Sequence, residues 1–241
     1  MSERNQNNIA TDHPSSGPGH DAVATRDRIL EAAGEVFAER GYRDATVREI
    51  CARAGANLAS INYHFGDKER LYAEVFDRAR CSSHEAMERL AELAGHPAED
   101  RLAAFVNAFL SKLLDRGRPT WHAKLMSREM IDPTAVLERM IEQSIRPQWE
   151  MLCGVVAELL GVPARSHAAS MAAASVMGQC LHYHHTREVG ARLCPGFYDR
   201  ERIIAEVAQH VTTFSLCAMQ GMRDRIGRGE VPREWIVEVL P

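Results

Sequence analysis

Twenty residues, from Thr46 to Phe65 (TVREICARAGANLASINYHF), carry the signals for two short helices and a tight turn between them. Thr46 and Glu49 have the T-x-x-E spacing of a capping box, in which a hydroxyl and a carboxylate satisfy free amides at a helix start. Gly55 comes where a left-handed residue can end the first helix, and Asn57 can cap the second helix two residues later. This spacing predicts a helix-turn-helix.

The second predicted helix has two different faces. Ile61 and Phe65 are four residues apart, so both should face inward. The opposite face carries Leu58, Ala59, Asn62 and Tyr63. Such a face can enter a DNA major groove, where Asn and Tyr bond bases or phosphates and Ala or Leu contacts a thymine methyl. On spacing alone, an ordinary pair of helices inside a bundle fits equally well.

The flanking sequence favours the DNA-binding interpretation. An amphipathic helix that includes Ile29 and Phe37 stops at Gly41, and Gly66-Asp67 ends one helix and caps another that begins at Lys68. The whole run from residue 25 to 76, TRDRILEAAGEVFAERGYRDATVREICARAGANLASINYHFGDKERLYAEVF, resembles the N-terminal domain of the TetR family of transcriptional repressors. Order, spacing and residue type agree at many positions.

The resemblance implies roles for individual residues. Thr46 matches the phosphate-binding helix cap of the family, residues 57–64 its recognition helix, and Lys68 its backbone-anchoring lysine. Tyr63 and His64 match its aromatic phosphate contacts, although His64, beside Phe65, also fits a packed residue bonded to a backbone carbonyl. Leu58 departs from the pattern, since many members have Lys or Arg there, and this favours apolar contact with a base. The candidate DNA-binding residues are Thr46, Asn57, Leu58, Ala59, Ser60, Asn62, Tyr63, His64 and Lys68.

Charge and cysteine usage limit the class of protein. The formal net charge is -4, so any positively charged surface must be local. Sequence-specific DNA binding is therefore expected, rather than nonspecific electrostatic binding along DNA. The 6 cysteines show no C-x-x-C spacing, which indicates free thiols in a reducing cytosol. No signal-peptide pattern opens the chain, and no apolar run approaches the ~20 residues that span a bilayer. We therefore expect a cytoplasmic protein with no membrane partner.

The rest of the chain predicts helices punctuated by Gly and Pro, without strand-like alternation, so the fold class is all-α. A helix beginning at Pro133 should be kinked or divided by Pro147, an Ala-rich helix should cover about residues 164–189, and the last long helix about residues 199–226. The expected domains are a disordered arm (1–21), a three-helix DNA-binding domain (22–66), a larger helical domain (67–226) and a tail (227–241).

A second resemblance covers roughly residues 120–190. The runs SREMIDPTAVLERMIEQSIRPQWEMLCGVVAELLG and QCLHYHHTREV look like the C-terminal domain of CerR-type TetR regulators. The resemblance implies a homodimer built mainly from the last two long helices. It also implies a response to a small-molecule effector, whose identity the family does not fix.

Candidate residues for these two roles follow from composition. A pocket should be mostly apolar with a few polar groups, and the candidates are Trp121, His122, Met126, Glu129, Met130, Arg146, Trp149 and His182. Core packing or structural ion pairs would explain the same residues. The candidates for a close helix–helix dimer contact are Ala169, Ala172, Ala173, Val176, Phe214 and Cys217, and close packing within one chain is the alternative.

His182 and His185 lie three residues apart on one helical face, with Cys180 and Glu188 nearby. Metal sites use such pairs, but no fourth ligand has a clear spacing, so no metal and no cofactor is expected. The function that these patterns favour is a ligand-responsive regulator, a repressor, that binds a pseudo-palindromic DNA operator as a homodimer. The alternatives are a DNA-binding dimer without an effector and a metal-dependent enzyme that uses the His182/His185 cluster.

Overall fold

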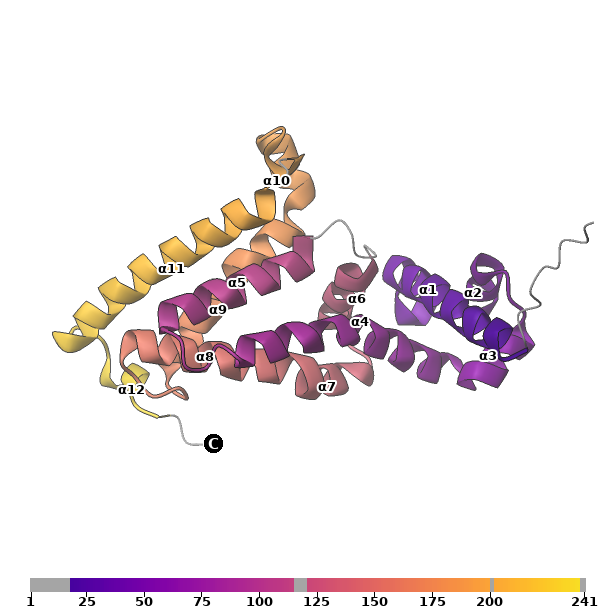
Figure 1. Cartoon of the computed structure of the whole chain (residues 1–241), viewed down its shortest axis with the longest axis horizontal. Helices are drawn as coiled ribbons and strands as arrows, with labels where there is room; N and C mark the ends of the chain where they lie inside the picture. Colours follow the sequence, from indigo (N-terminus) through magenta and orange to yellow (C-terminus); the bar gives the residue numbers. More distant parts are fainter. Residues whose placement is uncertain (1–17, 115–120, 200–201, 239–241) are drawn as a thin grey trace, which may run out of the picture. The chain divides into compact units, whose positions relative to one another are not determined.

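The computed structural model describes residues 18–114, 121–199 and 202–238, and the side chains of these residues except those of 18–21 and 80–89. The described residues form helices joined by loops, and their one β feature is an isolated antiparallel bridge between Ser166 and Glu238 (Figure 1). The predicted all-α fold class is confirmed. The chain divides into two compact units, unit 1 up to Tyr72 and unit 2 from Ala73 onwards. The predicted domain boundaries stay predictions.

Unit 1 contains three helices and the start of a fourth. These are α1 (Pro18–Asp44), α2 (Val47–Ala54), α3 (Leu58–Phe65) and the first residues of α4 (Lys68–Ala91). Helix α1 begins at Pro18, inside the segment predicted to be a disordered arm, and the rest of that arm lies outside the described residues. Gly41 interrupts the helical geometry of α1 with φ 83°, at the predicted stop.

The apolar side chains of unit 1 meet in one core. Ile29, Ile50, Ile61 and Leu71, one from each of the four helices, are all 0% exposed. On the surface, Arg53 of α2 donates two hydrogen bonds of 2.9 Å to the carboxylate of Glu39 in α1. The core and this ion pair fix α2 and α3 against α1.

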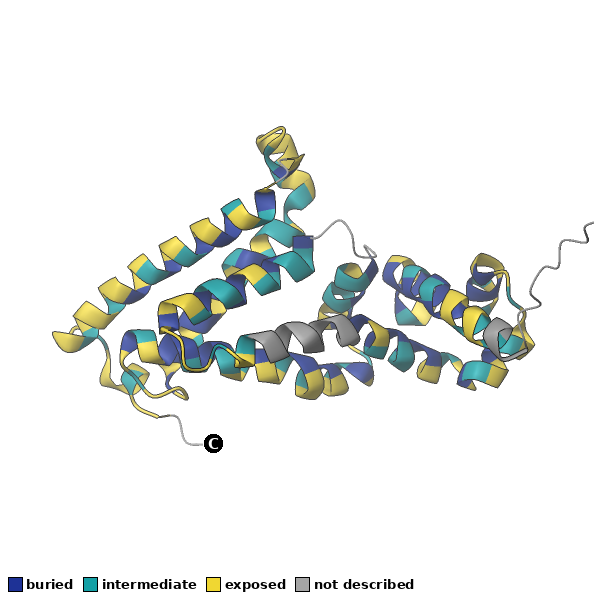
Figure 2. Ribbon diagram, in the orientation of Figure 1, coloured by how far each residue is buried: buried dark blue, intermediate teal, exposed yellow. Residues whose placement is uncertain are grey.

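Unit 2 is built from the remainder of α4 and the helices that follow it. These are α5 (Ala98–Leu114), α6 (Trp121–Ile131), α7 (Val136–Met140), the π-helix η1 (Ile141–Ile145), α8 (Arg146–Leu160), α9 (His167–His185), α10 (Arg187–Leu193), the 3-10 helix η2 (Phe197–Asp199), α11 (Ile203–Gly227) and α12 (Arg233–Ile236). Helices α5, α8, α9 and α11 pack on one another around a shared apolar core. Figure 2 shows α11 buried along one side and exposed along the other.

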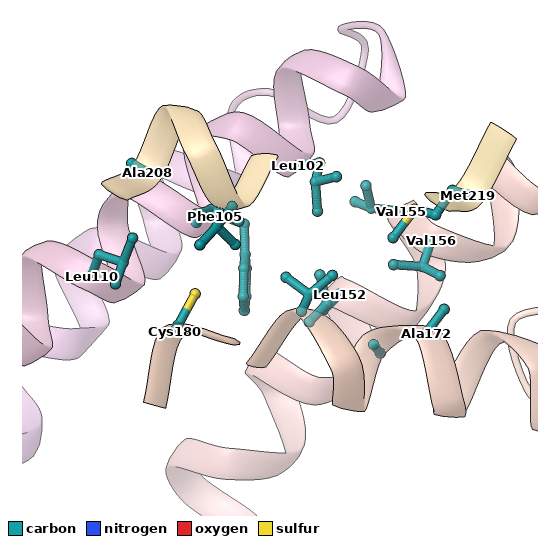
Figure 3. Close-up of a cluster of buried hydrophobic side chains, with 14 of the residues drawn as sticks. Leu102, Phe105, Leu110, Leu152, Val155, Val156, Ala172, Cys180, Ala208 and Met219 are labelled. Atoms are coloured by element: carbon teal, nitrogen blue, oxygen red, sulfur yellow. The ribbon is translucent and has the colours of Figure 1, made fainter. Parts of the chain in front are cut away.

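Leu152 of α8 lies in the middle of this core. In Figure 3 it lies between Phe105 of α5, Val156 of α8 and Ala172 of α9, and Ala208 and Met219 of α11 belong to the same cluster, farther from it. Burial of these side chains is the main contribution to holding the four helices together, because each removes apolar surface from water.

Pro147 divides the helix in which it lies, as predicted. Its ring removes one N–H and would clash with the carbonyl four residues back, so a regular α-helix cannot run through it. The preceding turn widens instead into η1, where Arg146 N–H donates to the carbonyl of Ile141, five residues back. The prediction did not foresee this π-helical segment.

The predicted Ala-rich helix is two helices in the structure. Helix α9 ends at His185, and α10 begins at Arg187. Thr186 lies between them with φ -97° and ψ 10°, and its hydroxyl donates to the carbonyl of His182 at 2.7 Å. A threonine side chain that bonds the backbone locally competes with helix continuation, which explains the break. Within the described residues, no helix has the length and apolarity needed to cross a membrane.

Candidate nucleic-acid interface and ligand cavity

Side-chain caps hold the first turns of α2 and α3 in unit 1. Thr46 Oγ1 accepts a hydrogen bond from Glu49 N–H at 3.2 Å, and Asn57 Oδ1 accepts from Ser60 N–H at 2.8 Å. Gly55 ends α2 in the left-handed conformation, with φ 60° and ψ 36°. The Glu49 carboxylate accepts from Arg40 Nε at 3.4 Å, so the second half of the predicted capping box is replaced by a contact to α1.

One face of α3 is open to solvent. Tyr63 is 81% exposed and Leu58 57% exposed, and Ala59 and Asn62 are exposed beside them. The opposite face holds Ile61 in the core. The helix therefore presents a small, polar and aromatic surface to solvent while its apolar side fixes its position.

Ser60 and His64 are less available than the other candidates on α3. The Ser60 hydroxyl donates to Asn57 Oδ1 at 3.0 Å, so it contributes to the cap. His64 is partly buried, and its ring centroid lies 5.0 Å from that of Tyr63 and 6.0 Å from that of Phe65. Ser60 therefore stabilises the start of α3, and His64 packs beside the exposed ring of Tyr63.

Lys68 opens α4 beside the end of α1. Its Nζ donates to the carbonyl oxygen of Arg43 at 3.3 Å and lies 4.7 Å from the ring centroid of Tyr42. Burial lowers the pKa of Lys68, while the nearby carboxylate of Asp44 acts in the opposite direction. The lysine therefore connects the start of α4 to the end of α1. Its positive charge lies shortly after the end of α3 in the sequence.

Unit 2 contains a cavity of about 130 Å³. It is lined from α4, α5, α6, η1, α8 and α9, and its larger apolar side chains are Phe109, Leu113, Met126, Met130, Ile145, Met177 and Leu181. The polar side chains in the lining are Lys112, His122, Ser127, Ser144 and Gln148. Gln148 Nε2 donates to the carbonyl oxygen of Ser144 at 2.6 Å, so α8 is bonded to the π-helical segment at the cavity wall.

Three of the eight predicted pocket residues, His122, Met126 and Met130, line this cavity. The other five do not, and each has a physical reason. Glu129 is 0% exposed and accepts two hydrogen bonds from Thr134. Trp121 is 4% exposed, and Trp149 packs on the core of unit 2. Arg146 forms a surface ion pair with Glu142, and His182 is exposed.

Sequence reasoning missed Lys112, Ser144 and Gln148, which come from three different elements. One signal was available, since Pro147 predicts a disturbed helix and π-helical segments occur frequently at functional sites. Ser144 belongs to that segment, and Gln148 follows Pro147.

The predicted dimer residues fall into two groups. Ala169, Ala172, Ala173 and Val176 are at most 8% exposed and face the interior of unit 2, so the alternative of close packing within the chain applies to them. Phe214 is 58% exposed, and Cys217 is exposed one turn later on α11. The exposed side of α9 carries Met171, Ala174 and Gly178.

The histidine cluster does not assemble a metal site. His184 Nδ1 lies 3.1 Å from the carbonyl oxygen of Leu113, and His185 Nε2 lies 3.1 Å from Ser127 Oγ. Cys180 is buried, which raises its pKa to about 12. Among the residues that the structure describes, no three His, Cys, Asp or Glu side chains are placed to hold a metal ion.

His184 predicts a pH dependence of stability. Burial lowers its pKa, the charges of His185 and Arg187 lower it further, and the hydrogen bond to Leu113 acts in the opposite direction. The unfolded chain binds the proton near pH 6.5, before the folded chain does. The stability that neutral His184 contributes is therefore present above about pH 6.5 and is lost as pH falls toward the folded pKa.

Urea unfolding at pH 7.5 and 5.5 measures this effect. The free energy of unfolding should fall with pH, and it should fall less in His184→Gln, whose amide can still donate to Leu113. His182→Gln, at an exposed position of the same helix, is the matched control and should keep the wild-type pH dependence. Equal pH dependence in the wild type and His184→Gln would contradict the assignment.

Comparison with known proteins finds two family matches, one in the N-terminal part of the chain and one in the C-terminal part. Residues 29–75 match the family "Bacterial regulatory proteins, tetR family", and residues 98–219 match "HTH-type transcriptional dual regulator CecR, C-terminal domain", the type given as CerR in the sequence analysis. CecR of Shigella flexneri is 31% identical over 166 residues, which cover 65% of this chain and 74% of that protein.

Two further relatives extend the comparison. The transcriptional repressor AcnR of Corynebacterium diphtheriae is 34% identical over 122 residues, which cover 48% of this chain and 63% of that protein. The crystal structure of FadR from Bacillus subtilis, in complex with stearoyl-CoA, superposes with a TM-score of 0.54 at 20% identity, over 79% of this chain and 97% of that chain. The family matches and the CecR relative together show that this chain belongs to the TetR family of transcriptional regulators.

Proposed function

We propose that this regulator is a repressor that binds a pseudo-palindromic operator as a homodimer and is released by a small-molecule effector. The observation that supports DNA binding most strongly is the exposed face of α3, with Asn62 and Tyr63 at its centre and caps at both ends of the turn. A face of this kind fits a major groove, where Asn bonds adenine and Tyr can bond a phosphate. AcnR, one of the relatives, is itself described as a repressor.

Dimerisation is expected to use the exposed sides of α9 and α11. Phe214 supplies a large apolar anchor, and the small side chains at Ala174 and Gly178 allow a second copy to approach closely. A two-fold axis would place two α3 helices in successive major grooves, roughly 34–36 Å apart.

The cavity in unit 2 is the proposed effector site. FadR, a relative in fold, is crystallised with stearoyl-CoA, which supports ligand binding in a domain of this kind. Helix α4 supplies Lys68 to unit 1 and Ala79 to the cavity lining, so one continuous helix joins the two functions. A preference of about 1–3 kcal/mol between two positions of α4 would change operator affinity about 5–150-fold. The alternative of a regulator without an effector leaves this cavity without a role.

Substitutions on α3 test the DNA-binding assignment. Asn62→Ala should change base preference by about 1–3 kcal/mol at one position of each half-site. Tyr63→Ala should weaken binding to all sequences alike, because a phosphate carries no sequence information. The measurement is fluorescence anisotropy on a selected operator fragment and on variants of it, at two salt concentrations.

Two controls accompany these variants. Tyr63→Phe separates the hydroxyl from the ring. Val189→Ala removes another exposed apolar side chain, on α10, and should leave binding unchanged. Lys68→Ala should also weaken binding, because it removes a positive charge and the hydrogen bond from Lys68 to the carbonyl oxygen of Arg43. If Asn62→Ala, Tyr63→Ala and Lys68→Ala all bound the operator as the wild type does, α3 would not be the recognition helix.

A further inference from the structure

Two buried polar side chains lie next to each other in the wall of the cavity in unit 2. Gln148 of α8 is 9% exposed and Ser144 of the π-helical segment is 7% exposed, and both line the cavity. Gln148 Nε2 donates to the carbonyl oxygen of Ser144 at 2.6 Å. This bond fixes the orientation of the amide, because only its nitrogen can donate to a carbonyl. The amide oxygen, Oε1, takes no part in that bond.

The remaining hydrogen-bonding groups of these two side chains have no partner in the part of the chain that the structure describes. There, Gln148 Oε1 accepts no hydrogen bond, and the Ser144 hydroxyl neither donates nor accepts one. Buried polar groups without a partner are unfavourable, and nearly all of those in native proteins are bonded to protein or to ordered water. Because both residues line a cavity, a molecule inside it can supply the missing bonds.

The charged and titratable groups in the lining offer less to a ligand. Lys112 is partly exposed and, like His122, already has an interaction partner. None of the described lining residues is an aspartate or glutamate. A ligand with a full charge would leave water for a mainly apolar lining whose cation already has a partner, which is costly. The lining therefore favours an uncharged ligand.

The volume limits the apolar part of such a ligand. The cavity measures about 130 Å³, and most of its lining is apolar, including Phe109, Met126 and Met177. An apolar protein cavity of about 150 Å³ holds one benzene molecule, so this one has room for roughly a single six-membered ring. A long acyl chain is much bulkier and does not fit.

We propose that the effector is a compact, uncharged molecule with a hydroxyl group, whose ring occupies the apolar part of the cavity and whose hydroxyl bonds Gln148 and Ser144. A hydroxyl both donates and accepts, so it can donate to Gln148 Oε1 and accept from Ser144 Oγ. This inference rests on the proposed function, in which the cavity is the effector site, and adds the chemical class of the ligand. The ligand would contact the π-helical segment, and such segments are frequent at functional sites.

Calorimetric titration of the full chain tests the class with matched probes. Benzyl alcohol and cyclohexylmethanol are each compared with the hydrocarbon in which a methyl group replaces the hydroxyl, ethylbenzene or ethylcyclohexane. In a wholly apolar cavity the hydrocarbon binds tighter, because the hydroxyl loses its hydrogen bonds to water. In the wild type, at least one alcohol should bind as tightly as its hydrocarbon or more tightly. Benzoate and benzylamine, which are charged at pH 7.5, should bind more weakly than benzyl alcohol.

Substitutions in the cavity wall identify the groups that bond the hydroxyl. Gln148→Met keeps the approximate shape of the side chain but lacks the amide. It should lower the ratio of alcohol affinity to hydrocarbon affinity about 5–150-fold, the usual effect of leaving a buried hydrogen-bonding group unpaired. Ser144→Ala should lower the ratio in the same direction. Retained hydrocarbon binding shows that the cavity of a variant is intact.

Gln179→Met is the matched control. Gln179 Nε2 also donates to the carbonyl oxygen four residues before it, that of Ser175, but Gln179 is not among the described residues that line the cavity. Its ratio of alcohol affinity to hydrocarbon affinity should equal that of the wild type. If Gln148→Met no longer binds the hydrocarbon, Ser144→Ala decides the question by the same ratio.

Three results would overturn the proposed class. The first is that neither alcohol binds the wild type as tightly as its hydrocarbon, the second that a charged probe binds tighter than benzyl alcohol. The third is that the wild-type ratio survives in a variant of Gln148 or Ser144 that still binds the hydrocarbon.

A DNA-binding measurement with the same probes distinguishes failure of the class from failure of the proposed function. If ethylbenzene, benzoate or benzylamine releases operator DNA while the alcohols do not, the effector function stands and the class falls. If the alcohols bind in a Gln148-dependent way but leave operator affinity unchanged, the class stands and the effector function falls.

Discussion

Replacing Phe214 by Asp should convert the protein to a monomer and lower its operator affinity about 10²–10⁴-fold, the range by which joining two binding modules raises avidity. Phe214 is 58% exposed on α11, where a second copy would bury it. Asp at this position places a charge beside its own symmetry mate in an apolar contact, and burial of unpaired charge is strongly unfavourable. Sedimentation velocity should show the 26.9 kDa chain instead of twice that mass.

Gln209→Asp is the matched control for this variant. Gln209 is also exposed on α11, but five residues earlier, so it lies about 140° around the helix axis from Phe214. The Gln209→Asp protein should remain dimeric and bind the operator normally.

Cysteine labelling followed by peptide mapping adds a second readout. Cys194 and Cys217 are both exposed in the single chain. Dimerisation should protect Cys217 from the label, while Cys194, which precedes η2 in the sequence, should stay reactive. A Phe214→Asp protein that stays dimeric would show that α11 does not form the interface.

Leu152→Ala should destabilise unit 2 by about 2–5 kcal/mol, the usual cost of truncating a fully buried leucine. Leu152 is 0% exposed and contacts the side chains that join α5, α8 and α9 (Figure 3). The substitution leaves a cavity that rigid helices on several sides cannot close. Chemical denaturation monitored by circular dichroism measures the loss.

Leu193→Ala gives the comparison on an exposed site. Leu193 is 77% exposed on α10, so the same chemical change there should alter the free energy of unfolding by no more than about 0.5 kcal/mol. Equal destabilisation by the two variants would mean that the core of unit 2 is not centred on Leu152.

The helix-turn-helix could be predicted in detail because its signals are local. Thr46 and Asn57 cap helices within three residues of themselves, and Gly55 adopts the left-handed conformation that its position required. Pro147 likewise divides its helix through a clash with its own preceding turn. Such effects depend on a few neighbouring residues, so sequence alone contains them.

The sequence predicts less well which residues share a surface, a cavity or a hydrogen-bond partner. Ala172 and Phe214 were grouped together, yet the first is buried in unit 2 and the second is exposed, because small residues serve close packing within a chain and between chains alike. Glu129 has the polarity of a pocket residue, but its carboxylate accepts hydrogen bonds from Thr134, in the loop between α6 and α7. The cavity brings together residues from six elements, and no periodicity in the sequence specifies which of them face one space.

Selection of DNA fragments from a random pool, with purified protein at near-physiological salt and a nonspecific competitor, tests the central claim most directly. The wild type should recover an inverted repeat whose half-sites are about 10–10.5 base pairs apart, or a multiple of that spacing. The double variant Asn62→Ala/Tyr63→Ala, altered only on the exposed face of α3, should lose this motif. Recovery of no motif by the wild type, or of the same motif by the double variant, would contradict the assignment of α3 as the DNA-reading helix of a dimeric regulator.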